Sequence, residues 1–342
     1  MKKGRIQFFS LAMVAAFGFF VVFGSLTQAL AEDKEIKIAR QYGISYLPLM
    51  MMEKLKLVEK HAKAAGLGDV TVEWKTLAGG ADMNEALLSK SIDFVSGGVA
   101  PMIKIWAKTK GNFEVKALSS INSMPLYLNT NNPNVKTIRD FTDKDRIALP
   151  AVKVSIQAVT LQMAAAKVFG DSNYQKLDHL TVTMSHPDGM VTMLSGKSEV
   201  TSHFTAPPFQ YQELEKPGVH TVVNSYDVLG GPATFNLVWT TSEYRNANPK
   251  TYNAVVAAID EAINIINKDK RAAAQTYVEI SKSKQPVAEV IKMMSDPLIQ
   301  FTTTPLNTMK YADFMFRVGS IKVKPNSWKD MFFPNAQSLP GS

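Results

Sequence analysis

Five short segments hold the residues of this chain that are best suited to bind a small molecule. Each follows an expected strand and leads toward an expected helix, where free backbone N–H groups favour anions. Hydroxyl, amide and aromatic side chains in these segments add hydrogen bonds and flat apolar contacts. The candidate ligand-binding residues are Tyr42, Ser45 and Tyr46; Gly79 and Gly80; Gly97, Gly98 and Val99; Lys153, Ser155 and Gln157; and His203, Phe204 and Thr205.

A purely structural role is the alternative for each segment. Glycine turns serve geometry alone in many α/β proteins, and Asp82 competes for the partial positive charge of the helix expected after Gly80. Tyr42, Tyr46 and Phe204 could equally pack in a core. The convergence of five such segments at the carboxyl ends of strands favours a binding site.

The sequence shows no catalytic or metal-binding motif. Cysteine is absent, which excludes thiol nucleophiles, disulfides and thiolate metal sites. Neither a P-loop nor a GxSxG turn occurs. The five histidines lack the spacing of a zinc site, and we interpret His186 as part of a helix start before Pro187. We therefore expect a protein that is not an enzyme and has no cofactor and no metal.

An internal repeat indicates how these segments are positioned. Residues 88–101 (LSKSIDFVSGGVAP) recur without gaps as residues 194–207 (LSGKSEVTSHFTAP), with five of fourteen positions identical. Each copy predicts a helix end, a strand and a loop, then a helix with proline at its first position. A chance match is the alternative. The repeat favours two related lobes whose equivalent loops face each other across a cleft.

The surrounding pattern predicts an α/β fold with mostly parallel sheets and helices on both faces. Strands are expected at 35–39, 70–74, 146–149 and 180–183, and a helix at 156–169 between the N-cap Ser155 and Gly170. Two apolar strands, at 125–129 and 234–240, break the alternation and are expected to cross between the lobes. We predict a signal peptide at 1–31, the first lobe at 33–124 and 238–325, the second at 125–237, and a loosely packed tail at 326–342.

The N-terminus indicates export. Lys2, Lys3 and Arg5 precede an apolar run at 8–23 that ends in Ala29-Leu30-Ala31, which is typical of a secretory signal peptide cleaved after Ala31. Cleavage removes three basic residues and no acidic ones, which lowers the formal net charge from +8 to +5. The remaining basic residues are scattered among acidic ones, so we expect no nucleic-acid partner. We predict a periplasmic, soluble monomer.

On several motifs the chain resembles the periplasmic substrate-binding proteins of nitrate-, sulfonate- and taurine-type ABC importers. The resemblance lies in residues 77–80 (LAGG), 84–88 (NEALL), 92–94 (IDF), 150–157 (PAVKVSIQ), 202–209 (SHFTAPPF) and 237–240 with Asn248-Pro249. It implies the type II two-lobe fold with two crossing strands as a hinge. It also implies capture of a small solute by hinge closure and delivery to a permease with its ATPase.

The identity of the solute stays open at this stage. A small anionic organic solute, such as a sulfonate, taurine-like compound or carboxylate, fits the helix N-termini, but only Arg40 lies near any of the five segments. An arginine fork is the usual clamp for such groups. The alternatives are a pyrimidine or another aromatic precursor, a ligand-sensing module for a membrane receptor, and an exported enzyme on the same fold.

Overall fold

The structure is a computed structural model that describes residues 32–342. The predicted signal peptide and its cleavage after Ala31 lie outside the described residues. Within residues 32–342, no helix is both long and apolar enough to cross a membrane.

The first lobe is built on a five-stranded sheet with the order β2-β1-β3-β10-β4. Four strands run in one direction and β10 runs against its two neighbours. The strands are β1 (Glu35–Arg40), β2 (Thr71–Thr76), β3 (Phe94–Gly98), β4 (Lys116–Ser120) and β10 (Asn236–Thr240).

The second lobe is built on another five-stranded sheet, with the order β7-β6-β8-β5-β9. Again four strands share a direction and one, β5, runs against its neighbours. The strands are β5 (Tyr127–Thr130), β6 (Arg146–Leu149), β7 (Thr181–Thr183), β8 (Val200–Thr205) and β9 (His220–Asn224). The prediction of an α/β protein with mostly parallel strands is confirmed.

The repeat seen in the sequence corresponds to equivalent places in the two sheets. Its two copies supply β3 and β8, and each of these strands is the third in its sheet, beside the one reversed strand. The predicted helix starts are wrong by two residues, because α4 (Val99–Thr109) begins before Pro101 and α7 (Phe209–Leu214) begins after Pro207.

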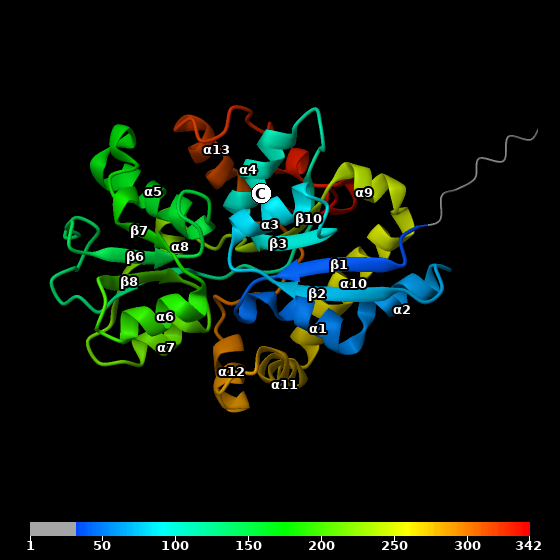
Figure 1. Cartoon of the computed structure of the whole chain (residues 1–342), viewed down its shortest axis with the longest axis horizontal. Coiled ribbons are helices and arrows are strands. Elements are labelled where there is room, and N and C mark those ends of the chain that lie inside the picture. Colours follow the sequence, from blue (N-terminus) through cyan, green and yellow to red (C-terminus); the bar gives the residue numbers. More distant parts are fainter. Residues whose placement is uncertain (1–31) are drawn as a thin grey trace, which may run out of the picture. The chain divides into compact units, whose positions relative to one another are not determined.

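Helices cover both faces of each sheet, as Figure 1 shows for α5 and α6 on opposite sides of the second sheet. In α5 the predicted bounds and both caps are confirmed: the Ser155 hydroxyl accepts the Ala158 N–H, and Gly170 follows with a φ of 89°. Besides α4 and α7, the α-helices of residues 32–342 are α1 (Leu47–Leu55), α2 (Leu57–Ala64), α3 (Gly80–Leu88), α5 (Ile156–Phe169), α6 (His186–Leu194), α8 (Ser225–Leu229), α9 (Ser242–Ala247), α10 (Pro249–Lys268), α11 (Lys270–Ser281), α12 (Val287–Met294) and α13 (Thr308–Arg317).

The lobes are joined by segments that lie side by side. The backbone of Ser123, just before β5, bridges both Thr234, just before β10, and Gln300. The two reversed strands, β5 and β10, therefore overlap the two expected crossings, and the segment around Gln300 lies beside them as a third segment at the hinge.

The C-terminal segment is not loosely packed, so that prediction is wrong. Trp328, Phe332 and Phe333 are buried, and the Phe333 N–H donates to the Ala117 carbonyl at 2.9 Å on β4. The Pro- and Ser-rich composition concealed three aromatic side chains whose burial stabilises the segment. Residues 326–342 thus extend the core of the first lobe.

Candidate functional site

A small cavity, with an accessible volume of about 10 Å³, lies where the two lobes meet, at the carboxyl ends of β1, β3 and β6. Ligands of parallel α/β sheets bind at this end of the strands. The first lobe and the hinge line the cavity with Gln41, Tyr46, Gly80, Gly98, Pro101 and Phe235. The second lobe lines it with Pro150, Ser155, Ile156, Gln157 and His186.

A larger cavity, of about 320 Å³, lies within the first lobe. Its lining includes Asp33, Ile92 and Asp93, which precede β1 and β3, so it opens at the amino ends of the strands. None of the five predicted segments reaches it. We therefore take the cavity between the lobes as the functional site, although it is the smaller of the two.

The glycines of the predicted segments allow the lobes to touch. A Cβ atom at Gly98 would lie 2.6 Å from the Ile156 side chain, and one at Gly79 would lie 2.5 Å from the Pro150 carbonyl oxygen. At a third contact the Ile44 N–H donates to the Pro207 carbonyl at 3.3 Å. Any side chain at Gly79 or Gly98 would hold the lobes apart.

Several backbone groups that we expected to bind an anion already have partners. The Gly79 N–H donates to the Asp82 carboxylate at 3.2 Å, so this carboxylate does occupy the helix start. The Val99 N–H donates to the Phe235 carbonyl at 3.1 Å. Gly97 lies against Gln41 and Trp239 inside the first lobe. In this closed arrangement Gly79, Gly97 and Val99 do not line the cavity, and the N–H groups of Gly79 and Val99 are not free to bind an anion there.

Of the three candidate residues in the segment after β1, only Tyr46 lines the cavity. The Tyr46 ring lines the cavity, and its hydroxyl accepts a hydrogen bond from the Asn236 side chain at 3.0 Å. Burial raises the pKa of Tyr46, which therefore stays protonated. Ser45 is buried behind it, whereas Tyr42 is 40% exposed and lies outside the cavity.

The segment before α5 supplies polar groups to the cavity. Ser155 and Gln157 line it, and the Ser155 hydroxyl also caps α5. Lys153 does not line it, and its carbonyl accepts a hydrogen bond from Lys104 across the lobe contact at 3.4 Å. Burial and the nearby Lys153 charge lower the pKa of Lys104. This pair of cations lies at the lobe contact, outside the cavity.

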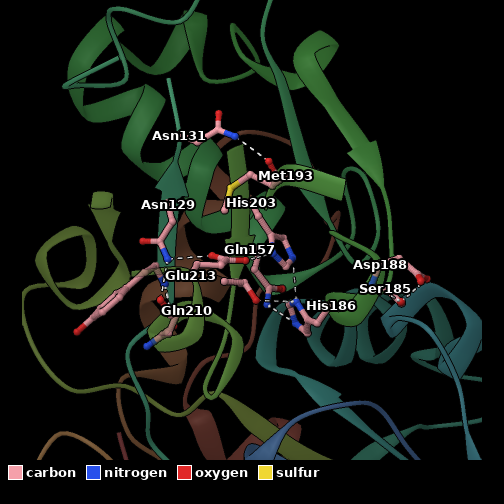
Figure 2. A network of polar contacts seen from close by, with 12 residues as sticks. Asn129, Asn131, Gln157, Ser185, His186, Asp188, Met193, His203, Gln210 and Glu213 are labelled. Atoms are coloured by element: carbon pink, nitrogen blue, oxygen red, sulfur yellow. Dashed lines mark hydrogen bonds and ion pairs between the residues drawn. The ribbon is translucent and has the colours of Figure 1, made fainter. Parts of the chain in front are cut away.

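The segment in β8 lies behind the cavity, within a buried polar network (Figure 2). His203, Phe204 and Thr205 are fully buried and do not line the cavity. Figure 2 shows the His203 ring between the Glu213 carboxylate, 2.6 Å from Nδ1, and the His186 ring, whose Nδ1 lies 3.3 Å from Nε2. His203 and Thr205 therefore reach the cavity only through His186.

His186 is one of the cavity residues that our interpretation of the sequence did not select. It does begin a helix, as predicted, with Ser185 as the N-cap. The internal repeat could have identified His186 as a candidate, because the same offset of 106 residues aligns His186 with Gly80 and Asp188 with Asp82. The first residues of α3 and α6 thus line the cavity from the two lobes.

No family model and no curated protein matches the chain. Solved structures do match. The alkanesulfonate-binding protein SsuA from Xanthomonas axonopodis pv. citri, bound to MOPS, is 18% identical with a TM-score of 0.66, covering 85% of this chain and 95% of that protein. The periplasmic nitrate-binding protein NrtA from Synechocystis PCC 6803 is 13% identical with a TM-score of 0.64, covering 90% and 86%.

A third similar structure is a Candida albicans protein described as having the generic periplasmic binding protein fold. It is 14% identical, with a TM-score of 0.64 over 87% of this chain and 96% of that protein. The chain has the periplasmic binding protein fold. The fold expected from the resemblance is thereby confirmed.

Proposed function

We propose that this protein is the periplasmic solute-binding component of an ABC importer, and that it captures a small, anionic organic solute between its lobes. The observation that carries the proposal is the cavity lined by both lobes, with Gln41 and Tyr46 on one side and Ser155, Gln157 and His186 on the other. The similar sulfonate- and nitrate-binding structures support the same reading.

Closure explains how such a protein signals occupancy. The Gly98–Ile156 and Gly79–Pro150 contacts exist only when the lobes meet, and a solute in the cavity adds contacts that both lobes share. A ligand that binds the closed form more tightly shifts the equilibrium toward it. A permease that recognises the closed surface would therefore accept the loaded protein in preference to the empty one.

The cavity favours recognition by hydrogen bonds. None of the residues that line it is Lys or Arg. Amide, hydroxyl and imidazole groups would hold the oxygen atoms of a sulfonate or carboxylate, and the rings of Tyr46 and Phe235 would contact its apolar part. We further propose that the exported protein is a monomer without turnover, and that its partners are a permease and an ATPase.

A thermal-shift panel on residues 32–342 tests this proposal. The panel contains taurine, ethanesulfonate, benzoate, acetate, nitrate and uracil, in a phosphate buffer because sulfonate buffers would compete. A ligand at one hundred times its Kd stabilises the folded state by about 2.7 kcal/mol. We expect one anionic class to raise the Tm.

Two controls separate specific capture from general salt effects. Gly98→Ala, which blocks the lobe contact, should lose the shift, and sodium chloride at equal ionic strength should give none. A shift with uracil alone would replace the anionic solute by an aromatic precursor. No shift with any solute, from protein first unfolded and refolded to release a trapped ligand, would contradict the proposal.

A further inference from the structure

Two buried asparagine side chains connect the Tyr46 hydroxyl to the hinge. Asn122 lies just before the first crossing between the lobes, and Asn236 begins β10 just after the second. Both asparagines are fully buried, and Tyr46 is 2% exposed. The Asn122 amide nitrogen lies 3.2 Å from the Asn236 amide oxygen, and the Asn236 amide nitrogen lies 3.0 Å from the Tyr46 hydroxyl oxygen. A short chain of hydrogen bonds therefore runs from the hinge to the cavity.

Backbone groups determine the direction of each hydrogen bond in this chain. The Ser45 carbonyl can only accept, so the Asn122 group that faces it at 2.6 Å is the amide nitrogen. The Asn236 backbone N–H can only donate, so the Asn122 group that faces it at 3.2 Å is the amide oxygen. The second hydrogen of the Asn122 amide goes to the Asn236 amide oxygen, which leaves the Asn236 amide nitrogen to face Tyr46. Reversing either amide would set two donors or two acceptors against each other.

The Tyr46 hydroxyl therefore accepts from Asn236 and keeps its own hydrogen for another partner. Burial raises the pKa of Tyr46, so the hydroxyl is protonated at neutral pH. A phenolic hydroxyl has one hydrogen to donate. Within residues 32–342, Asn236 is the hydrogen-bond partner of this hydroxyl, and the Tyr46 side chain lines the cavity. The hydrogen is thus available to a molecule in the cavity.

Ser155 provides a second hydroxyl donor from the other lobe. Its oxygen accepts the Ala158 backbone N–H at 3.2 Å, and a backbone N–H can only donate. This bond does not use the Ser155 hydroxyl hydrogen, and Ser155 also lines the cavity. In each lobe, a structural hydrogen bond to the hydroxyl oxygen thus leaves the hydroxyl hydrogen for a solute.

We propose that the Asn122–Asn236 pair holds the Tyr46 hydroxyl as a hydrogen-bond donor to the solute. Tyr46 in the first lobe and Ser155 in the second then bind acceptor oxygen atoms of the same molecule. Tyr46 is a specificity-determining contact, and Asn122 and Asn236 are positioning residues. The inference rests on the proposed function for the solute. It names the recognised group as an oxyanion, such as a sulfonate or carboxylate, because an ammonium group would set donors against donors.

Neutron diffraction from crystals of deuterated wild-type protein tests the donor without any solute, because it locates hydrogen positions directly. The residues of the chain of hydrogen bonds lie in the first lobe and at its end of the hinge, so opening of the lobes should leave their contacts in place. We expect an Asn236 amide deuterium directed at the Tyr46 oxygen, and a Tyr46 hydroxyl deuterium turned away from Asn236. A hydroxyl deuterium that points at Asn236 would overturn the inference.

Tyr46→Phe tests the contact with the solute, because it removes the hydroxyl and keeps the ring. Loss of one hydrogen bond to a charged group should lower affinity for ethanesulfonate, or for the best anion of the panel, by about 10- to 100-fold. Tyr311→Phe is the matched control, since that hydroxyl is also buried and lies 3.2 Å from the Thr160 hydroxyl, but Tyr311 does not line the cavity. The control should keep the wild-type affinity, measured by calorimetry.

Asn236→Asp tests the positioning role, because it keeps the shape of the side chain and replaces the amide donor by an acceptor oxygen. The Tyr46 hydrogen should then turn toward the new carboxylate and away from the cavity. Tyr46→Phe, added to this variant, should therefore lower affinity further by less than about twofold. Repulsion between the new charge and the anion weakens binding in its own right, but it leaves the effect of Tyr46→Phe at its wild-type size.

An additive double-mutant cycle would thus show that Asn236 does not act through Tyr46. If Asn236→Asp does not fold, the neutron structure of the wild type decides the positioning role. If the wild type binds an anion and folded Tyr46→Phe protein binds it equally well, solute capture stands and the inference fails. If the wild type binds nothing in the panel, the proposed function fails, and the neutron structure still decides the direction of the Tyr46 hydroxyl.

Discussion

The two lobes share a strand order but bring different chemistry to the cavity. The first lobe contacts the second lobe at Gly79 and Gly98. Because glycine has no side chain, the backbone there can approach the second lobe closely. The second lobe brings Gln157 and His186, supported by the buried Glu213–His203 pair. We infer that the glycines of the first lobe determine how closely the lobes approach, and that the second lobe supplies most of the polar contacts to the solute. A repeat can thus keep its architecture while its equivalent positions, Gly80 and His186, diverge in function.

The largest expected effect concerns the support of the second lobe. Glu213→Ala leaves His203 buried without its partner, and breaking such a pair typically costs about 3–5 kcal/mol of folding free energy. Urea denaturation should show this loss. Glu199→Ala, which removes an exposed carboxylate, should cost at most about 1 kcal/mol. Equal losses in the two variants would mean that the buried network does not stabilise the second lobe.

Next in size is the effect of a side chain at the lobe contact. In Gly98→Ala the new Cβ would overlap Ile156 of the other lobe, and overpacking of this kind costs about 1–3 kcal/mol. Since the lobes can open to avoid the overlap, affinity measured by calorimetry should fall about 5- to 150-fold while the Tm of the empty protein changes little.

Gly97→Ala is the matched comparison at the neighbouring position. Its Cβ would approach Gln41 and Trp239 within the first lobe, so opening gives no relief and the Tm of the empty protein should fall. If Gly98→Ala instead lowers the Tm as much as Gly97→Ala does, the Gly98 contact contributes to the stability of the fold and not to closure of the lobes.

A smaller effect is expected for one hydrogen bond in the cavity. Gln157→Leu keeps the approximate size of the side chain and removes its amide, so affinity for the solute should fall about 3- to 10-fold. The control is Gln162→Leu on the same helix, whose amide bonds Asp178 and does not line the cavity. Unchanged affinity in Gln157→Leu would remove this residue from the site.

The smallest effect concerns a carboxylate distant from the cavity. Burial raises the pKa of Asp93 in the first lobe. Its folded form therefore holds a proton more tightly than its unfolded form, and Asp93 disfavours folding as the pH rises above its unfolded pKa, with the full effect above the raised value. Asp93→Asn should raise the Tm by about 1–2 °C at pH 7 and by less at pH 3. Solute affinity should not change.

The exposed Asp69 provides the comparison for Asp93, since its side chain is 93% exposed beside Lys63. Asp69→Asn should give no such pH-dependent difference in Tm. A change of solute affinity in Asp93→Asn would show that the first lobe influences recognition of the solute as well as how closely the lobes approach.

Local patterns were sufficient to predict most of the fold. Alternation identified β1 and β2, capping residues bounded α5, and the repeat placed β3 and β8 in equivalent positions. The tail was misjudged because composition does not show whether aromatic residues such as Trp328 find a surface to cover.

The site was predictable only in part, because its contacts join residues far apart in the chain. Tyr46, Gly80, Gly98, Ser155 and Gln157 were predicted and do line the cavity. Whether each binds a solute stays a prediction, as it does for the candidates that lie outside the cavity. The partners of His203 could not be foreseen, since its contacts with Glu213 and His186 depend on how α6 and α7 pack against β8.

The most direct test of solute capture is a crystal structure with the best solute of the panel. We predict that its oxygen atoms lie within hydrogen-bond distance of Gln157 and His186, with the lobes in contact at Gly98. Density for the solute at any other place, or a bound state whose lobes stand apart, would contradict the account.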